Sequence, residues 1–446
     1  MHPGRYGGTP MGEDDNTGRR HLGLPAVVAL AAAVRLVYVA TKWHDPLLLN
    51  DSIYYSGQAR QLAHGTWFRE LFVDRPGAEH GPLTSLLMAP VSWMDDPVPW
   101  QRLVTVAAGI TLVWVIGRLA DEVAGRRVGL VAAVIAALYP NLWMNDGLVM
   151  SESISMLLVA LSLWAAWRLA TSPGDALPVR AAAWLGVATG LGMLARSELV
   201  LLAPLLAGWV AVARRREGST GRGRITGSDW RSAAVALAVA CAVVAPWVVF
   251  ILARFERPVF LTTNDGTTLL GANCDDAYQG PGVGGWSLIC VASDPDYAMD
   301  EEPSVRSARQ RNLAVQYVRA HLADVPKVVA ARLARTLDLY GWSDLVFQDV
   351  GEERPRWAAW AGIGAFWLLA VAAALGSRRV ARRLRWLLAA PVVVALATTV
   401  LFYGGHRIRS SAEPVVVILA AVSLVAVADR WRAARPPAVP PVPTPR

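Results

Sequence analysis

The 446-residue sequence is poor in charge and almost free of lysine. Only 17% of its residues are charged while 54% are hydrophobic, and of its 43 Lys and Arg residues only Lys42 and Lys327 are lysine. The net charge of +8 is therefore carried by arginine, whose clusters lie between apolar runs and form no basic stripe interleaved with aromatic residues. This distribution excludes an ordinary soluble protein and gives no sign of nucleic-acid binding.

Cysteine is also scarce, with three residues in the chain. Cys241 lies inside an apolar run, which is typical of inert packing. Cys274 and Cys290 lie in one long polar loop, and we expect a disulfide between them if that loop is outside the membrane. Two free thiols are the alternative.

The sequence is rich in long apolar runs. A run near 20 residues is long enough to cross a bilayer as a helix, so the chain predicts an all-α polytopic membrane protein with about ten spans. We expect these spans at 22–41, 101–120, 128–144, 152–170, 181–195, 199–213, 232–253, 357–376, 386–403 and 414–428. The apolar segment 82–94 is too short to span comfortably and is interpreted as interfacial or re-entrant.

Arginine clusters give the spans a direction, because short cytoplasmic loops are enriched in Arg and Lys. Arg19 and Arg20 place the N-terminus inside, and the clusters around Arg126, Arg215 and Arg382 fall on the same side only if 82–94 does not span. No small-residue cleavage site follows the first span, so we expect it to be retained. The protein is predicted to be a multi-pass plasma-membrane protein with both termini cytoplasmic.

The same pattern divides the chain into five parts. They are a cytoplasmic tail at 1–20, an N-terminal membrane module at 21–253 with a large external loop at 42–100, a longer external region at 254–356, C-terminal spans at 357–430, and a Pro-rich cytoplasmic tail at 431–446. Residues 258–296 predict turns and irregular loop. The periodicity of 304–340 predicts a helix lying on the outer membrane surface, with a soluble cap as the alternative.

The first external loop holds the densest polar chemistry. Asp51 lies a few residues beyond the first span, and Tyr54 and Tyr55 follow it, as aromatic residues often do at membrane surfaces. A carboxylate at the edge of hydrocarbon is costly to ionise and is a functional candidate. We expect partial desolvation to raise the pKa of Asp51. The alternative is that Asp51 only caps a short helix beginning at Ser52.

The predicted topology gathers acids and arginines on the external face. A carboxylate can deprotonate or orient an acceptor, and arginine can hold a phosphate through bidentate hydrogen bonds. The gathered residues are Asp51, Asp74, Arg75, Glu79, His80, Asp146, Glu152, Arg196, Glu198, His406, Arg407 and Arg409. This mixture is what a membrane enzyme acting on a phosphate-linked lipid requires.

Three of the basic residues follow one another closely before the last span. His406, Arg407 and Arg409 have no acid nearer in the sequence than Glu413, so we expect unpaired basic groups that suit a phosphate. Anchoring to ordinary lipid headgroups is the alternative. Arg35, inside the first span, either snorkels to the surface or faces a polar cavity.

Several short motifs occur in an order that resembles the GT-C superfamily of integral-membrane glycosyltransferases. The resemblance covers residues 20–430 and is closest to bacterial relatives of protein O-mannosyltransferases and lipid A aminoarabinose transferases. Its motifs are Asp51 with Tyr54-Tyr55, Glu79-His80-Gly81-Pro82-Leu83, Tyr139-Pro140, Ser151-Glu152, Ala195-Arg196, Pro246-Trp247, Pro258-Val259, Asn264-Asp265-Gly266, Gly271-Ala272-Asn273, and Arg407-Ile408-Arg409 with Pro414. Their order and spacing carry the resemblance, since each motif alone is weak.

The resemblance implies roles for individual residues. Asp51 matches the first-loop acid, which is the family's candidate catalytic base, and Glu152, or else Asp146, matches the second-loop acid. His80 stands where the aminoarabinose enzymes have Lys, and Gly81 where Pro is frequent, which leaves the sugar and the acceptor class open. The candidate substrate and phosphate ligands are Tyr54, Tyr55, Arg75, Glu79, His80, Arg196, His406, Arg407 and Arg409.

The activity implied by the resemblance is transfer of a sugar from a polyprenyl-phosphate donor to a protein, glycan or lipid acceptor on the external face. The expected partners are that donor and membrane lipid, and the oligomeric state is open. A divalent metal is optional, since the paired acids of oligosaccharyltransferases are not clearly present. The rival interpretation is a polyprenyl-lipid transporter, which would need charged residues at mid-span; the ionisable residues here gather near one face.

Overall fold

The computed structural model describes residues 23–48, 50–172, 178–215, 227–296, 298 and 300–434. The expected tail at 1–20 and most of the Pro-rich tail at 431–446 lie outside these ranges. Within them the chain forms helices, and its β structure is an isolated bridge between Arg69 and Pro76. The expectation of an all-α protein is confirmed.

Eight helical segments of the described chain are long and apolar enough to cross a membrane, and they match eight of the ten expected spans. They are α1 (Gly23–Ala40), α4 (Val98–Ala124), α7 (Glu152–Ala170), η3 (Ser197–Leu201) with α9 (Leu202–Arg215), α10 (Gly227–Leu252), α17 (Arg356–Ser377), α18 (Arg382–Leu401), and α19 (His406–Arg409) with η5 (Ser410–Ala412) and α20 (Glu413–Ala433). A shorter apolar helix of 17 residues, α8 (Val179–Ala195), corresponds to the expected span at 181–195, which makes nine of the ten.

The tenth expected span, at 128–144, is interrupted. Helix α5 (Arg126–Leu138) has 13 residues, Tyr139 is extended, and the short α6 (Pro140–Trp143) follows. Proline disfavours the helical conformation in the residue before it, so Pro140 ends α5 at Leu138. At about 1.5 Å per residue α5 covers about 20 Å, less than the ~30 Å hydrocarbon core.

Helix packing in the bundle depends on small residues. A Cβ added at Gly186 of α8 would lie 2.4 Å from the carbonyl oxygen of Ala236, and one at Gly190 would lie 3.0 Å from that of Ala240. Both contacts are with α10, so glycine lets the α8 and α10 backbones approach closely. Small residues at helix interfaces are common in membranes, where packing and not exclusion of water drives association.

The loop at 42–100, which is predicted to be external, folds into short helices. They are α2 (Asp51–Ala63), α3 (Leu83–Met88) and η2 (Ala89–Val91), so the 82–94 segment forms no span. Asn50 caps α2, its side chain accepting a hydrogen bond from the Ser52 N–H at 2.8 Å. The alternative in which Asp51 is the cap is therefore wrong: Asp51 is the first helical residue, and its carboxylate is free for other contacts.

The external region contains more helix than the Gly-rich sequence indicates. Its elements are α11 (Asp265–Ala272), α12 (Asp275–Tyr278), η4 (Gly280–Gly282), α13 (Leu288–Ala292), α14 (Pro303–Ala320), α15 (Val325–Thr336) and α16 (Trp342–Gly351). In α15 the arginines point inward: Arg332 is 4% exposed and donates to the carbonyl oxygen of Val400 at 2.9 Å. This contact fastens the external region to the end of α18.

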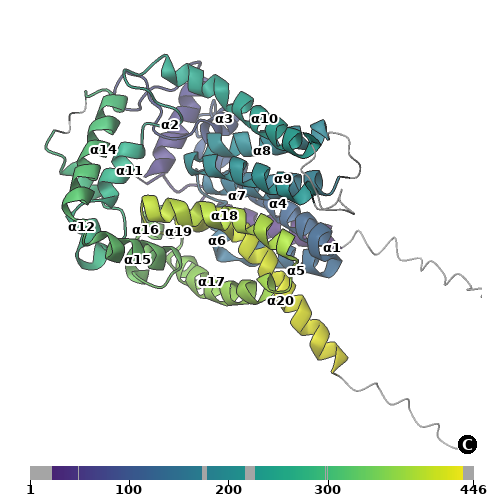
Figure 1. Ribbon diagram of the computed structural model, residues 1–446. Helices are drawn as coiled ribbons and strands as arrows, with labels where there is room; N and C mark the ends of the chain where they lie inside the picture. The colour runs from purple at the N-terminus through teal and green to yellow at the C-terminus, as the bar shows by residue number, and fades with distance from the viewer. Residues whose placement is uncertain are drawn as a thin grey trace, which may run out of the picture.

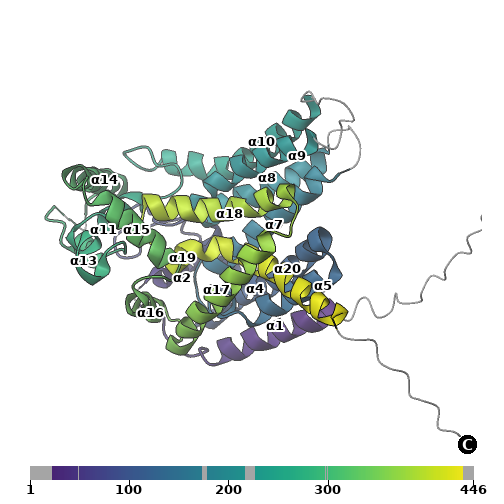
Figure 2. The same ribbon diagram turned by 60° about the horizontal axis from the view of Figure 1, so that its bottom comes forward.

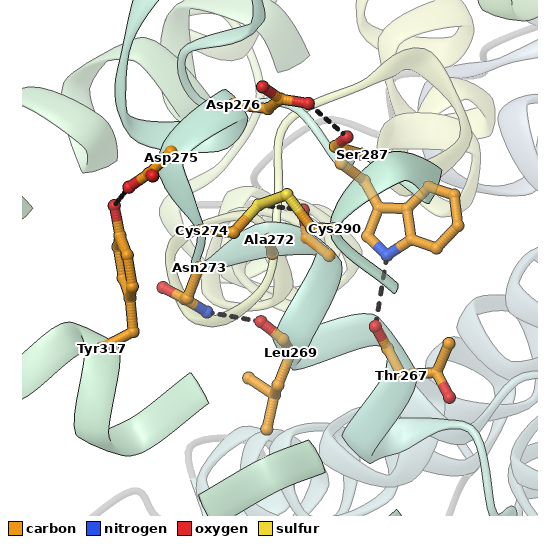
Figure 3. The surroundings of a disulfide bond; sticks show 12 residues. Thr267, Leu269, Ala272, Asn273, Cys274, Asp275, Asp276, Ser287, Cys290 and Tyr317 are labelled. Carbon is orange, nitrogen blue, oxygen red and sulfur yellow. Dashed lines mark hydrogen bonds between the residues drawn. A yellow bond between two sulfur atoms is a disulfide. The ribbon is translucent and has the colours of Figure 1, made fainter. Parts of the chain in front are cut away.

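A disulfide closes part of this region. Cys274 and Cys290 are bonded to each other across a sequence separation of 16 residues, as Figure 3 shows. Nearby, Tyr317 of α14 donates to Asp275 at 2.6 Å and Ser287 donates to Asp276 at 2.9 Å. The predicted disulfide is confirmed, and it joins the start of α12 to α13.

The external region lies at one end of the helical bundle. Figures 1 and 2 both place α11, α14 and α15 at this end, together with α2 and α19, while the far end of α20 points the opposite way. The turn between α17 and α18 lies away from the external region in Figure 2. The candidate site residues and the arginine clusters thus fall at opposite ends of the bundle.

Because arginine clusters stay on the cytoplasmic side, the bundle should be oriented with the external region outside the cell. In a Cys241→Ser background, Arg379→Cys between α17 and α18 should resist a membrane-impermeant maleimide in intact cells. Ala323→Cys, an exposed position between α14 and α15, should react. Labelling of Arg379→Cys from outside would reverse the orientation.

Candidate active site

The candidate site is built around one guanidinium group. Arg407 donates from Nη2 to Asp51 Oδ2 at 2.7 Å, from Nε to Glu152 Oε1 at 2.6 Å, and from Nη1 to Glu352 Oε1 at 3.0 Å. These carboxylates come from the start of α2, the start of α7 and the residue after α16. A single side chain therefore joins the first external loop, the bundle and the external region.

A second arginine extends the network. Arg196, between α8 and η3, donates from Nη1 to Glu152 Oε1 at 2.9 Å and from Nε to Glu198. Glu152 is 1% exposed, and a carboxylate buried to this degree is stable only when it is paired. The two arginines supply that pairing, so positive and negative groups alternate across the site.

The remaining oxygen of Glu352 is held from the other side. Arg354 contacts Glu352 Oε2 and also donates to Asn145 Oδ1 at 2.8 Å. Glu353, between them in sequence, accepts from Arg102 at 3.0 Å and from the Ser52 hydroxyl at 3.0 Å. The three residues at 352–354 thus tie the external region to α2, to α4 and to the loop after α6.

Asp51 has a second basic neighbour in His80, whose Nε2 lies 3.5 Å from Asp51 Oδ1. Burial alone would raise the pKa of Asp51, but Arg407 and His80 outweigh it and hold that pKa well below its usual range. The expected upward shift is therefore wrong, because the sequence did not reveal how close Arg407 lies. Burial would lower the pKa of His80, and Asp51 reverses this and raises it.

Two tyrosines position the histidine. The ring centroids of Tyr54 and Tyr55 lie 5.0 Å and 5.1 Å from that of His80. Both tyrosines are buried, and burial raises the pKa of Tyr55, so its hydroxyl stays protonated. Of the two, Tyr55 lines the cavity beside Asp51.

That cavity has a volume of about 400 Å³, a size that suits a small ligand. Its polar lining comprises Asp51, Tyr55, Glu79, His80, Ser151, Arg196, Ser197, Glu198, Thr262, Asn264, Asp265, Thr268, Thr398, Tyr403 and Arg407. Its remaining lining comes from Gly81, the end of α8, η3, the end of α18 and α19, and its apolar side chains are Ala195, Val200, Leu201, Leu401, Phe402 and Ile408. Among the candidates, Asp51, Tyr55, Glu79, His80, Arg196 and Arg407 meet here.

Arg409 and His406 lie elsewhere. Arg409 donates to Asp338 at 2.9 Å and to Glu413 at 2.7 Å, and its guanidinium lies 3.5 Å from the Phe366 ring centroid. His406 Nε2 lies 3.1 Å from Asp338 Oδ1. The expectation that 406, 407 and 409 are unpaired is wrong, because acids distant in sequence fold against all three.

Arg75 and Asp146 also lie outside the lining of the cavity. Arg75 pairs with Glu70 at 2.6 Å. Asp146 is fully buried and accepts from Arg35 Nε at 2.6 Å, and the Arg35 guanidinium also donates to the carbonyl oxygen of Ala137 at 3.2 Å. Arg35 therefore faces the protein interior instead of snorkelling, and the pair links α1 to the loop before α7.

Sequence reasoning missed Glu352 and Tyr403. Glu352 lies just before a predicted span, where a carboxylate is common and indicates no function. Tyr403 lies at the end of an apolar run. As for metals, no group of three or more His, Cys, Asp and Glu side chains within the described ranges is arranged to hold one. Asp51, Glu152 and Glu352 converge on Arg407 instead.

Comparison with known proteins identifies the architecture. A family model described as dolichyl-phosphate-mannose-protein mannosyltransferase matches residues 80–250. The archaeal oligosaccharyltransferase AglB from Archaeoglobus fulgidus, solved with an inhibitory peptide and a dolichol-phosphate, aligns over 94% of this chain with a TM-score of 0.54 and 15% identity. The chain has the GT-C fold. It spans about half of AglB, covering 52% of that chain.

Two further GT-C structures align less closely. The Pmt1-Pmt2 O-mannosyltransferase complex of S. cerevisiae bound to the sugar donor has a TM-score of 0.43 and 17% identity over 57% of this chain and 36% of that one. ArnT from Cupriavidus metallidurans bound to undecaprenyl phosphate has a TM-score of 0.44 and 14% identity over 93% of this chain and 82% of that one. No curated protein sequence matches significantly.

A structural role for Asp146 can be tested by stability. Asp146→Asn leaves Arg35 buried without its partner, which typically costs roughly 3–5 kcal/mol, so it should lower the melting temperature of the detergent-solubilised protein markedly. Asp74→Asn is the matched control, since Asp74 pairs with Arg69 but is 91% exposed, and exposed pairs contribute little. Equal melting temperatures for the two variants would contradict a structural role for Asp146.

Proposed function

We propose that this chain is a membrane glycosyltransferase that moves a sugar from a polyprenyl-phosphate donor to an acceptor on the external face. The observation that carries the proposal is the meeting of Arg407 and Asp51 in a cavity whose lining divides into charged or polar side chains and apolar side chains. A lipid-linked phosphosugar has the same division into a charged head and an apolar tail.

The donor's phosphate fits the basic side of the cavity. Arg196, Arg407 and His80 line it, and guanidinium groups bind phosphate oxygens in a planar, forked geometry. The donor's isoprenoid chain fits the apolar lining residues, of which Leu201 and Leu401 are 38% and 60% exposed. AglB, which has the same fold, was solved with a dolichol-phosphate, a ligand of this kind.

Asp51 is the candidate general base. An acceptor hydroxyl attacks the anomeric carbon in line with the departing phosphate, with inversion, and gives its proton to Asp51 as the new glycosidic bond forms. The bond between the anomeric carbon and the phosphate oxygen breaks, and its electron pair stays on that oxygen next to Arg407. When a phosphate shares Arg407, the carboxylate of Asp51 loses part of the attraction that lowers its pKa and becomes a better base.

Glu152 supports this arrangement without lining the cavity. It holds Arg196 and Arg407 side by side through one oxygen, Oε1. Two adjacent cations repel each other, and the attraction of both to a shared anion offsets this repulsion. Glu152 therefore fixes the spacing of the two groups proposed to bind the phosphate.

The direct test uses purified protein in proteoliposomes with radiolabelled polyprenyl-phosphate sugars and a membrane extract as the source of acceptor. Asp51→Asn keeps the shape and removes the base, so turnover should fall about 100-fold to 10,000-fold while donor binding persists. Glu152→Gln should cost less turnover. Transfer rates measured against donor concentration separate the two effects.

Arg407 provides the matched control for binding. Arg407→Ala should abolish donor binding, and Arg407→Lys should retain part of it, since a point charge replaces the fork. Full transfer activity in Asp51→Asn, Glu152→Gln and Asp146→Asn would refute the assignment of the active site to this face of the protein. Movement of the labelled lipid across the bilayer without transfer would favour the transporter.

A further inference from the structure

One carboxylate around Arg407 has no part in the proposed reaction. Asp51 is the proposed base, and Glu152 separates two arginines. Glu352 contacts Arg407 Nη1 at 3.0 Å, is 18% exposed, and lies outside the lining of the cavity. It is therefore placed to act on a phosphate bound at Arg407 through its charge and not through direct contact.

The end of a helix is an unfavourable position for the carboxylate of Glu352, and its contacts with Arg407 and Arg354 offset this. Glu352 is the C-cap residue of α16, where the negative end of the helix dipole disfavours an anion. The fixed position of the segment depends on its neighbours: Glu353 holds Arg102 and Ser52, and Arg354 holds Asn145. The charge of Glu352 is thus placed beside Arg407 by structure that other residues maintain.

The charge on the phosphate changes during the proposed reaction. The donor is a phosphodiester with one negative charge, whereas the polyprenyl phosphate left after transfer is a monoester with a charge of about −1.5 to −2 at neutral pH, since the second pKa of a phosphate monoester is about 6. Repulsion by nearby carboxylates therefore grows when the sugar leaves. In a partly buried site this repulsion is weakly screened.

We propose that Glu352 is a specificity-determining residue that disfavours the product polyprenyl phosphate relative to the sugar-bearing donor, and so promotes product release. The inference rests on the proposed function. Arg407 attracts both lipids, and the carboxylate of Glu352 penalises the lipid of higher charge.

Substitution of Glu352 by Gln isolates this charge. The amide oxygen of Gln still accepts a hydrogen bond from Arg407 Nη1, so this contact persists while the negative charge is lost. Arg354 loses its contact with Glu352 Oε2 but keeps Asp349 at 3.3 Å and Asn145 at 2.8 Å as acceptors. Glu352→Asp keeps the charge and serves as the conservative variant. Glu256→Gln removes one charge at an exposed position after α10 and serves as the matched control.

The experiment measures binding of two short lipids to the full-length protein in detergent at pH 8 by isothermal titration calorimetry. Farnesyl phosphate represents the product, and its monomethyl ester, a phosphodiester, represents the charge of the donor. Glu352→Gln should bind farnesyl phosphate about tenfold more tightly than wild type, which corresponds to about 1.4 kcal/mol, and the methyl ester about threefold more tightly or less. Glu352→Asp and Glu256→Gln should match wild type.

Three other outcomes would show whether the inference about Glu352 or the proposed function is wrong. If Glu352→Gln binds both lipids with wild-type affinity, more weakly, or with equal gains, Glu352 does not discriminate by charge and the inference is overturned. If Glu352→Asp also loses the discrimination, geometry and not charge is responsible, which overturns it as well. If wild type and Arg407→Ala bind farnesyl phosphate equally, Arg407 is not the phosphate site, and the proposed function fails.

Discussion

The buried carboxylate of Glu152 is the constraint on which the external end of the bundle depends. It lies at the first residue of α7, almost free of solvent, where an unpaired charge would be strongly destabilising. Its partners Arg196 and Arg407 lie 44 and 255 residues away in the sequence. Satisfying this one group brings the ends of α8 and α19 to α7 and leaves two arginines facing a cavity.

A few side-chain contacts also join the external region to the membrane helices. Residues 352–354 contact Arg407, Arg102 and Asn145 in succession, and Arg332 contacts the end of α18. The external region therefore completes the candidate site in addition to covering it. Because Ser52 also contacts Glu353, the position of Asp51 depends on a segment 301 residues away.

Features set by local pattern were predictable from the sequence. The lengths of the apolar runs predicted most of the membrane-spanning helices, and the positions of Asp51, Glu152, Arg196 and Arg407 relative to the spans predicted the main members of the site. Features set by distant contacts were not. Asp338 lies some 70 residues from Arg409 in the sequence, so the pairing of Arg409 left no local signal, and Glu352 had none either. Pro140 indicated the end of α5, but the length of the apolar run favoured a single span at 128–144.

We propose that Arg407 is the site at which a lipid-linked phosphate binds, with Leu201 and Leu401 beside it for the isoprenoid chain. A cryo-EM structure of the protein in nanodiscs with a polyprenyl phosphate added would test this. We expect phosphate density within hydrogen-bonding distance of Arg407, with the isoprenoid chain leaving between η3 and α18. Phosphate density at any other place on the protein, with Arg407 still bound only by its three carboxylates, would contradict it.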